Sequence, residues 1–227
     1  MAQKKISELG VAASIVGSDI LPVVESSVTK KVVAEKILMV QSLTDVRYKL
    51  IQIFPEALKL GGVNDPDFAK YKDDGGGSTG VYLYHFDKTS EEEAFFSFVT
   101  PPDYKEASDM YLEFKWTPKV NGGVGKKVCW GIEHTIADEG EVFGNTTFHY
   151  QDTATVDEDL LQDKHYRSEI VTHPGATLKI GHIHVCRLFR DATEVGGTDD
   201  FDNDAVLLGL IMRYQVDALG SATKDAK

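Results

Sequence analysis

The stretch MYLEFKWT, residues 110–117, decides the fold class, because apolar and polar residues alternate along it without a break. A period of two is typical of a β-strand that has one buried face. The stretch therefore predicts a strand that covers a core. The side predicted to face that core carries Met110, Leu112, Phe114 and Trp116.

The same period extends along most of the chain. The stretch 127–136 alternates in the same way, and strand-like runs recur at 80–86, 93–100, 178–189 and 205–216, with Pro- or Gly-containing turns between them. No convincing long helix interrupts this region. We therefore predict an all-β fold, an antiparallel β-sandwich that is jelly-roll-like.

The opening of the chain has a different pattern. Short apolar pieces alternate with turn residues and predict a strand over 19–25, a turn, a strand over 29–33 and a short helix over 34–39. A lone hairpin of this size is marginal in water, so we expect it to be ordered against another surface. The predicted organisation is an extended N-terminal docking arm (1–45), a connecting segment (46–79) and the sandwich domain (80–227). The run 46–54 fits either a strand or a helical turn.

Charge is distributed unevenly between arm and body. Residues 1–50 carry seven Lys and Arg against five Asp and Glu, so with a net charge of −12 the rest of the chain carries −14. Because nucleic-acid binding depends on cations that neutralise phosphate, we expect no nucleic-acid partner. No apolar run approaches the roughly 20 residues of a membrane span, and no export signal opens the chain. We expect neither membrane insertion nor export.

Both cysteines lie in apolar, strand-like runs. Cys129 and Cys186 are therefore predicted to be buried thiols, with no disulfide and no metal role.

Two strands carry apolar residues on both faces, so both of their faces need cover. The cover is either a loop or the N-terminal segment of the same chain, or the surface of another subunit. We favour the second alternative, since obligate homo-oligomer interfaces resemble a core cut in half. The residues predicted to form this interface are Phe95, Val99, Leu207 and Ile211.

Two groups of residues are candidate metal ligands. His182 and His184 lie on the same side of a strand, but the carboxylate that a cupin site needs is missing, so we interpret them as structural. The acidic run 199–204 fails as an EF-hand loop, because Ala205 and Ile211 stand where Gly and Glu are required. A calcium loop of another type remains an alternative to a solvated loop. We predict no metal site and no cofactor.

No catalytic motif is evident. The chain contains no Gly-x-Ser-x-Gly elbow and no phosphate-binding glycine loop that opens a helix. The carboxylates of 157–159 could pair for glycoside hydrolysis, but an acidic surface explains them equally well. We predict that the protein is not an enzyme.

Three pieces of the arm carry a resemblance. ISEL (6–9), GSDILPVV (17–24) and TKKV (29–32) resemble the N-terminal segment of structural proteins of tailed-bacteriophage virions, including capsid decoration proteins and fibre-like appendages. Short pieces of the body, among them 116–118 and 186–191, are similar to the β-rich bodies of small virion proteins.

The resemblance implies a capsid decoration (cement) protein that docks by its arm and projects a trimeric sandwich. It would be assembled in the host cytoplasm and located in the virion, with its own copies and the major capsid protein or another virion protein as partners. The residues that would dock the arm are Ile20, Leu21, Val23, Val24, Lys30, Lys31, Val32 and Ile37.

Two alternatives remain open. The first is a tail-fibre or adaptor protein that uses the same arm. The second is a carbohydrate-binding module for a host glycan, because sugar faces stack on aromatic rings. The candidate stacking residues are Tyr104, Tyr150 and Tyr166.

Overall fold

The computed structural model describes residues 20–25, 28–33, 47–152, 159–173 and 175–217. The chain divides into two compact units, Met1–Arg47 and Tyr48–Lys227, which we describe separately.

The N-terminal unit contains an antiparallel hairpin of β1 (Ile20–Glu25) and β2 (Val28–Val33), in which Ile20 pairs with Val33. The two predicted strands are therefore confirmed. The predicted helix over 34–39 lies outside the described residues.

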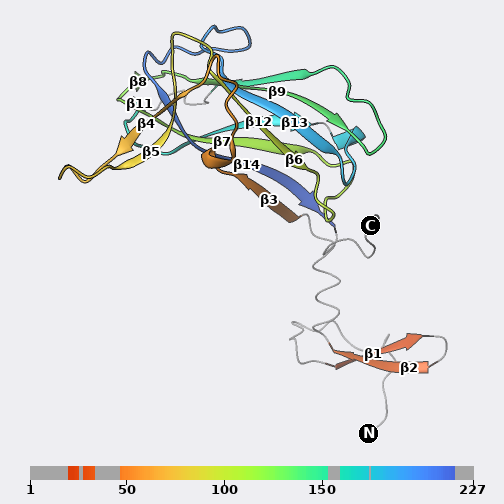
Figure 1. Cartoon of the computed structure of the whole chain (residues 1–227). Helices are drawn as coiled ribbons and strands as arrows, with labels where there is room; N and C mark the ends of the chain where they lie inside the picture. Colours follow the sequence, from red (N-terminus) through yellow and green to blue (C-terminus); the bar gives the residue numbers. More distant parts are fainter. Residues whose placement is uncertain (1–19, 26–27, 34–46, 153–158, 174, 218–227) are drawn as a thin grey trace. The chain divides into compact units, whose positions relative to one another are not determined.

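The body is a sandwich of two antiparallel sheets (Figure 1), as predicted. The larger sheet has six strands: β12 (Tyr166–His173), β7 (Met110–Pro118), β14 (Ala205–Val216), β5 (Val81–Phe86) and β4 (Asp67–Lys72) in that order, with β3 (Arg47–Ile53) paired to β14.

The smaller sheet has four strands: β10 (Thr147–Asp152), β9 (Cys129–Ala137), β13 (Ile183–Arg190) and β6 (Glu93–Val99). A short pair and two 3-10 turns complete the elements: β8 (Gly123–Val124), β11 (Asp159–Leu160), η2 (Pro55–Ala57) and η3 (Gly175–Thr177).

The strand order is that of a jelly roll. The order β5-β14-β7-β12 in the larger sheet faces β6-β13-β9-β10 in the smaller one, so the first and last of these eight strands lie side by side. The chain crosses between the sheets at almost every connection. The jelly-roll prediction is confirmed.

The core lies between the two sheets and uses the predicted faces. The four apolar residues of MYLEFKWT are fully buried. Trp130 of β9 packs against them, with its ring stacked on Phe114 at 5.1 Å between centroids. Cys129 and Cys186 are buried free thiols, as predicted. Burial raises the pKa of Cys186 to about 12, so this thiol is unreactive.

The predicted connecting segment contains two strands of the larger sheet. Residues 47–53 form β3 on the edge of β14, and residues 67–72 form β4 on the edge of β5. The run 46–54, which the sequence left open, is therefore a strand over most of its length. The pattern of β3 is indistinct because only the last residue of this strand, Ile53, is buried and the residues before it are partly or fully exposed.

A β-bulge changes which side chains of β14 face the core. The register against β7 shifts between Leu207 and Gly209. Beyond the bulge the even-numbered residues face inward, whereas before it the odd-numbered Leu207 faces inward and is 0% exposed. The prediction that Leu207 lies on the outer face was wrong, because a bulge inserts one residue and so exchanges the two faces.

Candidate functional site

The outer face of the six-stranded sheet carries a cluster of charged and aromatic side chains around Glu113. They share this face because β7 turns its odd-numbered residues away from the core, and because the registers place Glu169 and Arg213 beside them. We name this cluster the Glu113 platform. Its members are Tyr48, Tyr111, Glu113, Lys115, Arg167, Glu169 and Arg213.

Glu113 holds the cations of the platform together. It is 0% exposed. It accepts a hydrogen bond from Lys115 Nζ at 2.6 Å and two from the guanidinium of Arg213, and Arg167 Nη1 lies 3.5 Å away. A buried carboxylate with three cationic neighbours fixes the positions of those cations.

Two opposing effects set the pKa of Glu113. Burial alone would raise this pKa, but hydrogen bonds from Arg213 and Lys115 outweigh burial and lower it below its ordinary value. The carboxylate therefore stays ionised at neutral pH. A general acid needs a raised pKa, so Glu113 is suited to positioning charge and not to donating a proton.

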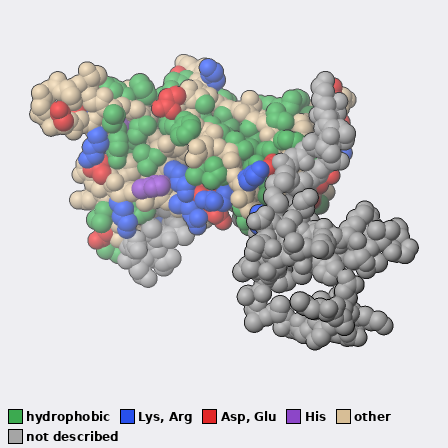
Figure 2. Space-filling view, turned by 90° about the horizontal axis from the view of Figure 1, so that it is seen from below, with side chains coloured by type: hydrophobic (Ala, Val, Ile, Leu, Met, Phe, Trp, Pro, Cys, Tyr) green, Lys and Arg blue, Asp and Glu red, His purple; other side chains and the backbone are tan. Residues whose placement is uncertain are grey.

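An open hollow of about 370 Å³ lies beside this ion cluster, lined by Tyr48, Tyr111, Glu169 and Arg213. The two tyrosine rings meet edge to face, 6.4 Å apart at 64°. Tyr48 is 48% exposed, and its hydroxyl accepts a hydrogen bond from Gln215 at 3.2 Å. Figure 2, seen from the side where β3 and β14 lie in Figure 1, shows Lys and Arg side chains gathered near the middle of the face. The hollow thus combines the ring of Tyr48, the N–H donors of Arg213 and the carboxylate acceptor of Glu169.

The sequence pattern does not reveal this platform. Tyr111, Glu113 and Lys115 were visible only as the polar side of a strand. Such a side is usually just solvated, so the period gave no reason to single them out. The buried position of Glu113 was the missing signal, and it depends on Arg167 and Arg213, which come from other strands.

Two of the three predicted stacking tyrosines are buried and cannot serve as surface platforms. Tyr104 is buried and donates its hydroxyl proton to the carbonyl of Ser108. Tyr166 is also buried and stacks on Trp116. Tyr150 packs closely over Gly196 and is half-buried. Two of the three rings thus belong to the interior, because their hydroxyls found partners inside the body.

The predicted interface residues do not form one patch. Phe95 and Val99 point outward from β6, and Ile211 points outward from β14, on the opposite face of the sandwich. Leu207 belongs to the core. Phe95 lines a second, apolar hollow of about 500 Å³ between β3, η2 and the β6 edge.

The predicted arm residues lie in β1 and β2, except Ile37, which lies outside the described residues. In the hairpin register Val23 pairs with Lys30, and Leu21 pairs with Val32. Lys30 and Lys31 of β2 therefore lie directly opposite apolar residues of β1 in the same hairpin.

His182 and His184 do not converge on one site. His184 Nε2 lies 2.9 Å from Thr100 Oγ1, and its ring stacks on Phe98 at 4.2 Å. His182 Nε2 lies 3.9 Å from Asp138 Oδ2. In the part of the chain that the structure describes, no three His, Cys, Asp or Glu side chains gather closely enough to hold a metal ion. Both histidines are buried side chains that pack within the body.

Buried histidines make the body sensitive to mild acid. Burial lowers the pKa of His134, which also faces His149, from 6.5 to about 4, and that of His184 to about 3. Between the pKa of each histidine in the folded state and its ordinary value of 6.5, the unfolded chain binds more protons than the folded one. The free energy of unfolding therefore falls as pH drops below 6.5. Burial raises the pKa of Glu92 to about 7, and this group acts in the opposite direction.

With at least two such histidines against one glutamate, we expect a net loss of about 1.4 kcal/mol per pH unit in this window. Urea unfolding at about pH 7.5 and about pH 5 would measure it. The substitution His134→Gln should flatten the slope by a similar amount. An unchanged slope in this variant would show that His134 takes up its proton equally in both states.

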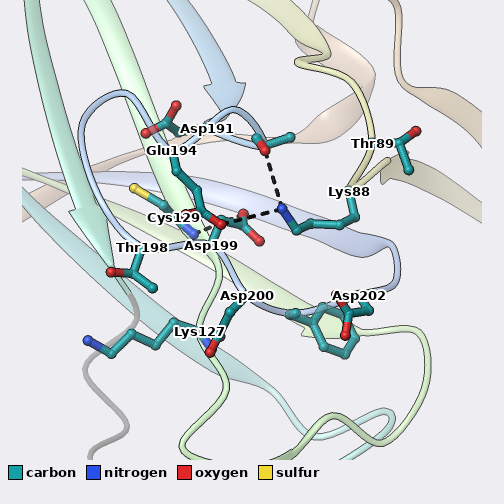
Figure 3. A network of polar contacts seen from close by, with 12 residues as sticks. Lys88, Thr89, Lys127, Cys129, Asp191, Glu194, Thr198, Asp199, Asp200 and Asp202 are labelled. Atoms are coloured by element: carbon teal, nitrogen blue, oxygen red, sulfur yellow. Dashed lines mark hydrogen bonds and ion pairs between the residues drawn. The ribbon is translucent and has the colours of Figure 1, made fainter.

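The acidic run 199–204 is held by groups of the body itself. Both oxygens of Asp199 accept hydrogen bonds from Arg190, at 2.7 and 2.8 Å. Asp200 accepts one from the backbone N–H of Lys127 at 2.6 Å (Figure 3). A calcium ion would compete for oxygens that these donors already occupy. The run belongs to the loop that joins β13 to β14, as one alternative predicted, although Asp199 is buried and not solvated.

Comparisons with known proteins give only distant likenesses. No family model and no curated protein matches the chain. A carbohydrate-binding module, TmCBM61 in complex with beta-1,4-galactotriose, is similar at 11% identity over 73% of this chain and 86% of that one, with a TM-score of 0.29.

Two larger proteins are also similar. One is from the infectious bursal disease virus Gx strain, at 10% identity over 89% of this chain and a TM-score of 0.31. The other is an aminopeptidase from a marine sediment archaeon, Thaumarchaeota archaeon, at 10% identity over 77% of this chain and a TM-score of 0.34. This chain spans 39% and 34% of those proteins.

Within the described residues, no helix is long and apolar enough to cross a membrane.

Proposed function

We propose that the chain is a non-enzymatic structural protein of a tailed-phage virion, most simply a capsid decoration protein that self-associates as a homotrimer. One observation carries the proposal. Residues 20–25 and 28–33, which belong to the segment that resembles phage virion arms, form a hairpin, and this hairpin belongs to a different compact unit from the jelly-roll body. A two-stranded hairpin gains stability from a partner surface, as docking on a particle would provide.

Copy number tests this function and its alternative together. Quantitative mass spectrometry of purified virions of the phage that encodes the chain should find hundreds of copies for a shell protein. A handful of copies would instead favour the tail-fibre or adaptor role. Complete absence from the particles would contradict both.

Reversing the charges of Lys30 and Lys31 in the arm should disrupt docking. In the full-length protein we expect the double variant Lys30→Glu, Lys31→Glu to lower incorporation into particles at least about tenfold, because charge complementarity steers and holds such contacts. The matched control reverses two exposed lysines of the body, Lys105→Glu and Lys179→Glu. Incorporation would be measured against the major capsid protein by mass spectrometry.

Removal of residues 1–45 is the complementary test. The body should keep its cooperative unfolding transition while particle binding is lost. Equal losses in the two double variants, or undiminished binding by the truncated protein, would contradict docking through the arm.

A second function is favoured by the Glu113 platform. An exposed tyrosine beside donors and an acceptor, over a hollow of about 370 Å³, fits a saccharide. Ligand pockets commonly occupy about 300–1,000 Å³. We therefore propose glycan binding by the body as the alternative to a purely structural role. Titration of the full-length protein with an oligosaccharide panel tests it.

A further inference from the structure

We infer that the Glu113 platform binds a carboxylate-bearing sugar, with Arg213 receiving the carboxylate and Tyr48 stacking on the sugar ring. The inference rests on the proposed glycan-binding function and specifies the class of glycan.

Charge is the first argument. The chain carries a net charge of −12, yet Lys115, Arg167 and Arg213 are brought together on one face of the body. Glu113, buried beneath them, offsets one of these charges, and Glu169 at the margin offsets a second. The platform keeps one excess positive charge within a chain of net charge −12, which favours an anionic group at this place.

The geometry of Arg213 is the second argument. Among the described residues, its hydrogen bonds go to Glu113, through Nε and Nη2. A guanidinium has five N–H donors in a fixed fork, so the donors on Nη1 and one on Nη2 remain. Its side chain is 37% exposed and lines the hollow. Glu113 thus holds the fork in place, and a preorganised fork matches a carboxylate.

The aromatic contact is the third argument. Tyr48 contacts the ring of Tyr111 and accepts a hydrogen bond from Gln215, and about half of the residue remains exposed. An exposed ring held in one orientation loses little entropy when a sugar packs on it. The stack would lie within the same hollow as the Arg213 fork.

Glu169 selects a sugar over other anions. Glu169 lines the hollow, and its Oε2 lies 3.8 Å from Arg167 Nη1, which also pairs with Glu113. An ionised carboxylate accepts hydrogen bonds only, so a ligand needs O–H or N–H donors there. A uronic acid residue offers both a carboxylate for Arg213 and hydroxyl groups for Glu169. A glutamate side chain or a phosphodiester offers only the anion.

The test is calorimetric titration of the full-length protein with an oligogalacturonate and with a neutral oligogalactose of equal length. We expect the uronate to bind about tenfold more tightly, the gain typical of a charge-assisted hydrogen bond. Raised salt should narrow this preference. Arg213→Gln should remove the preference, so that the acidic and the neutral sugar bind with similar affinity.

Tyr48→Ala should weaken both sugars about tenfold, because each loses the stack. It keeps the test valid if Arg213→Gln fails to fold, since Tyr48 is largely at the surface. The matched controls remove an exposed lysine and an exposed aromatic elsewhere in the body, Lys179→Gln and Phe143→Ala. Neither control should change either affinity.

The outcomes separate the two proposals. If the folded wild-type protein binds neutral and acidic sugars equally, the inference is overturned and glycan binding stands. If it binds neither, both are overturned. A glutamate-rich peptide that matches the uronate in affinity would overturn the assignment to sugars. A Tyr48→Ala variant that binds both sugars as tightly as the wild type would overturn the assignment of the site to the Glu113 platform.

Discussion

The substitution Arg190→Met is expected to destabilise the body by about 3–5 kcal/mol, the loss found when one partner of a buried ion pair is removed. Arg190 and Asp199 are both 0% exposed. All the donors of the guanidinium are used: two bonds go to Asp199, and others go to the carbonyl groups of Phe86, Phe201 and Asn203 at 2.6–3.0 Å.

Methionine fills much of the same space but leaves a carboxylate buried without its counter-charge. It also leaves three carbonyl groups without these donors: that of Phe86 at the end of β5, and those of Phe201 and Asn203 in the loop that joins β13 to β14. A loss of this size is a large part of the roughly 5–15 kcal/mol by which domains are stable. Equilibrium urea unfolding would measure it.

Arg187→Met is the matched control. Arg187 also contacts three carboxylates, Glu91, Glu93 and Glu133, but its side chain is 20% exposed on the outer face. Water can replace its partners in part, so we expect a loss of only about 1 kcal/mol. The double variant Arg190→Met, Asp199→Leu should recover part of the stability, since it removes both charges. Equal losses at Arg187 and Arg190 would contradict this account of the loop.

Trp130→Ala is expected to cost about 3–5 kcal/mol, the range for a large aromatic removed from a core. The indole is fully buried between the two sheets. It stacks on Phe114 at 5.1 Å and meets the edge of Phe86 at 5.2 Å. Because rigid strands surround the site, the cavity cannot collapse fully. Thermal or urea unfolding would report the loss.

Phenylalanine substitutions supply the sharper comparison. Among the described residues, Trp130 Nε1 has no hydrogen-bond partner, whereas Trp116 Nε1 donates to Ser168 at 3.1 Å. Both replacements lose similar volume, but only Trp116→Phe loses a hydrogen bond and leaves its acceptor unpaired. We therefore expect Trp116→Phe to cost about 1 kcal/mol more than Trp130→Phe. The reverse order would show that Trp130 has a polar partner.

Much of the body could be predicted from local pattern alone. The period of two in MYLEFKWT and in 127–136 determined which residues face the core, and the turn residues between runs determined where strands end. Strand geometry sends successive side chains to opposite faces, so this information is local and survives without knowledge of the partners. The apolar strand-like runs likewise predicted that both cysteines are buried.

Local pattern failed where pairing between strands decides the outcome. One inserted residue at the bulge of β14 exchanged the two faces, so Leu207 entered the core. Tyr104 and Tyr166 turned inward because partners for their hydroxyls exist there. The sequence pattern of β3 was indistinct because this strand is largely exposed, and its position is determined by pairing with β14.

The sequence by itself determined an all-β body with two sheets around one core, and an arm that forms a hairpin. Only the tertiary structure decided where a ligand site can lie. Tyr48, Glu113, Arg167 and Arg213 come from four strands far apart in the chain. Their meeting depends on sheet order and register, which arise from hydrogen bonds between strands. The buried charge on Glu113 is stabilised in part by arginines that other strands supply.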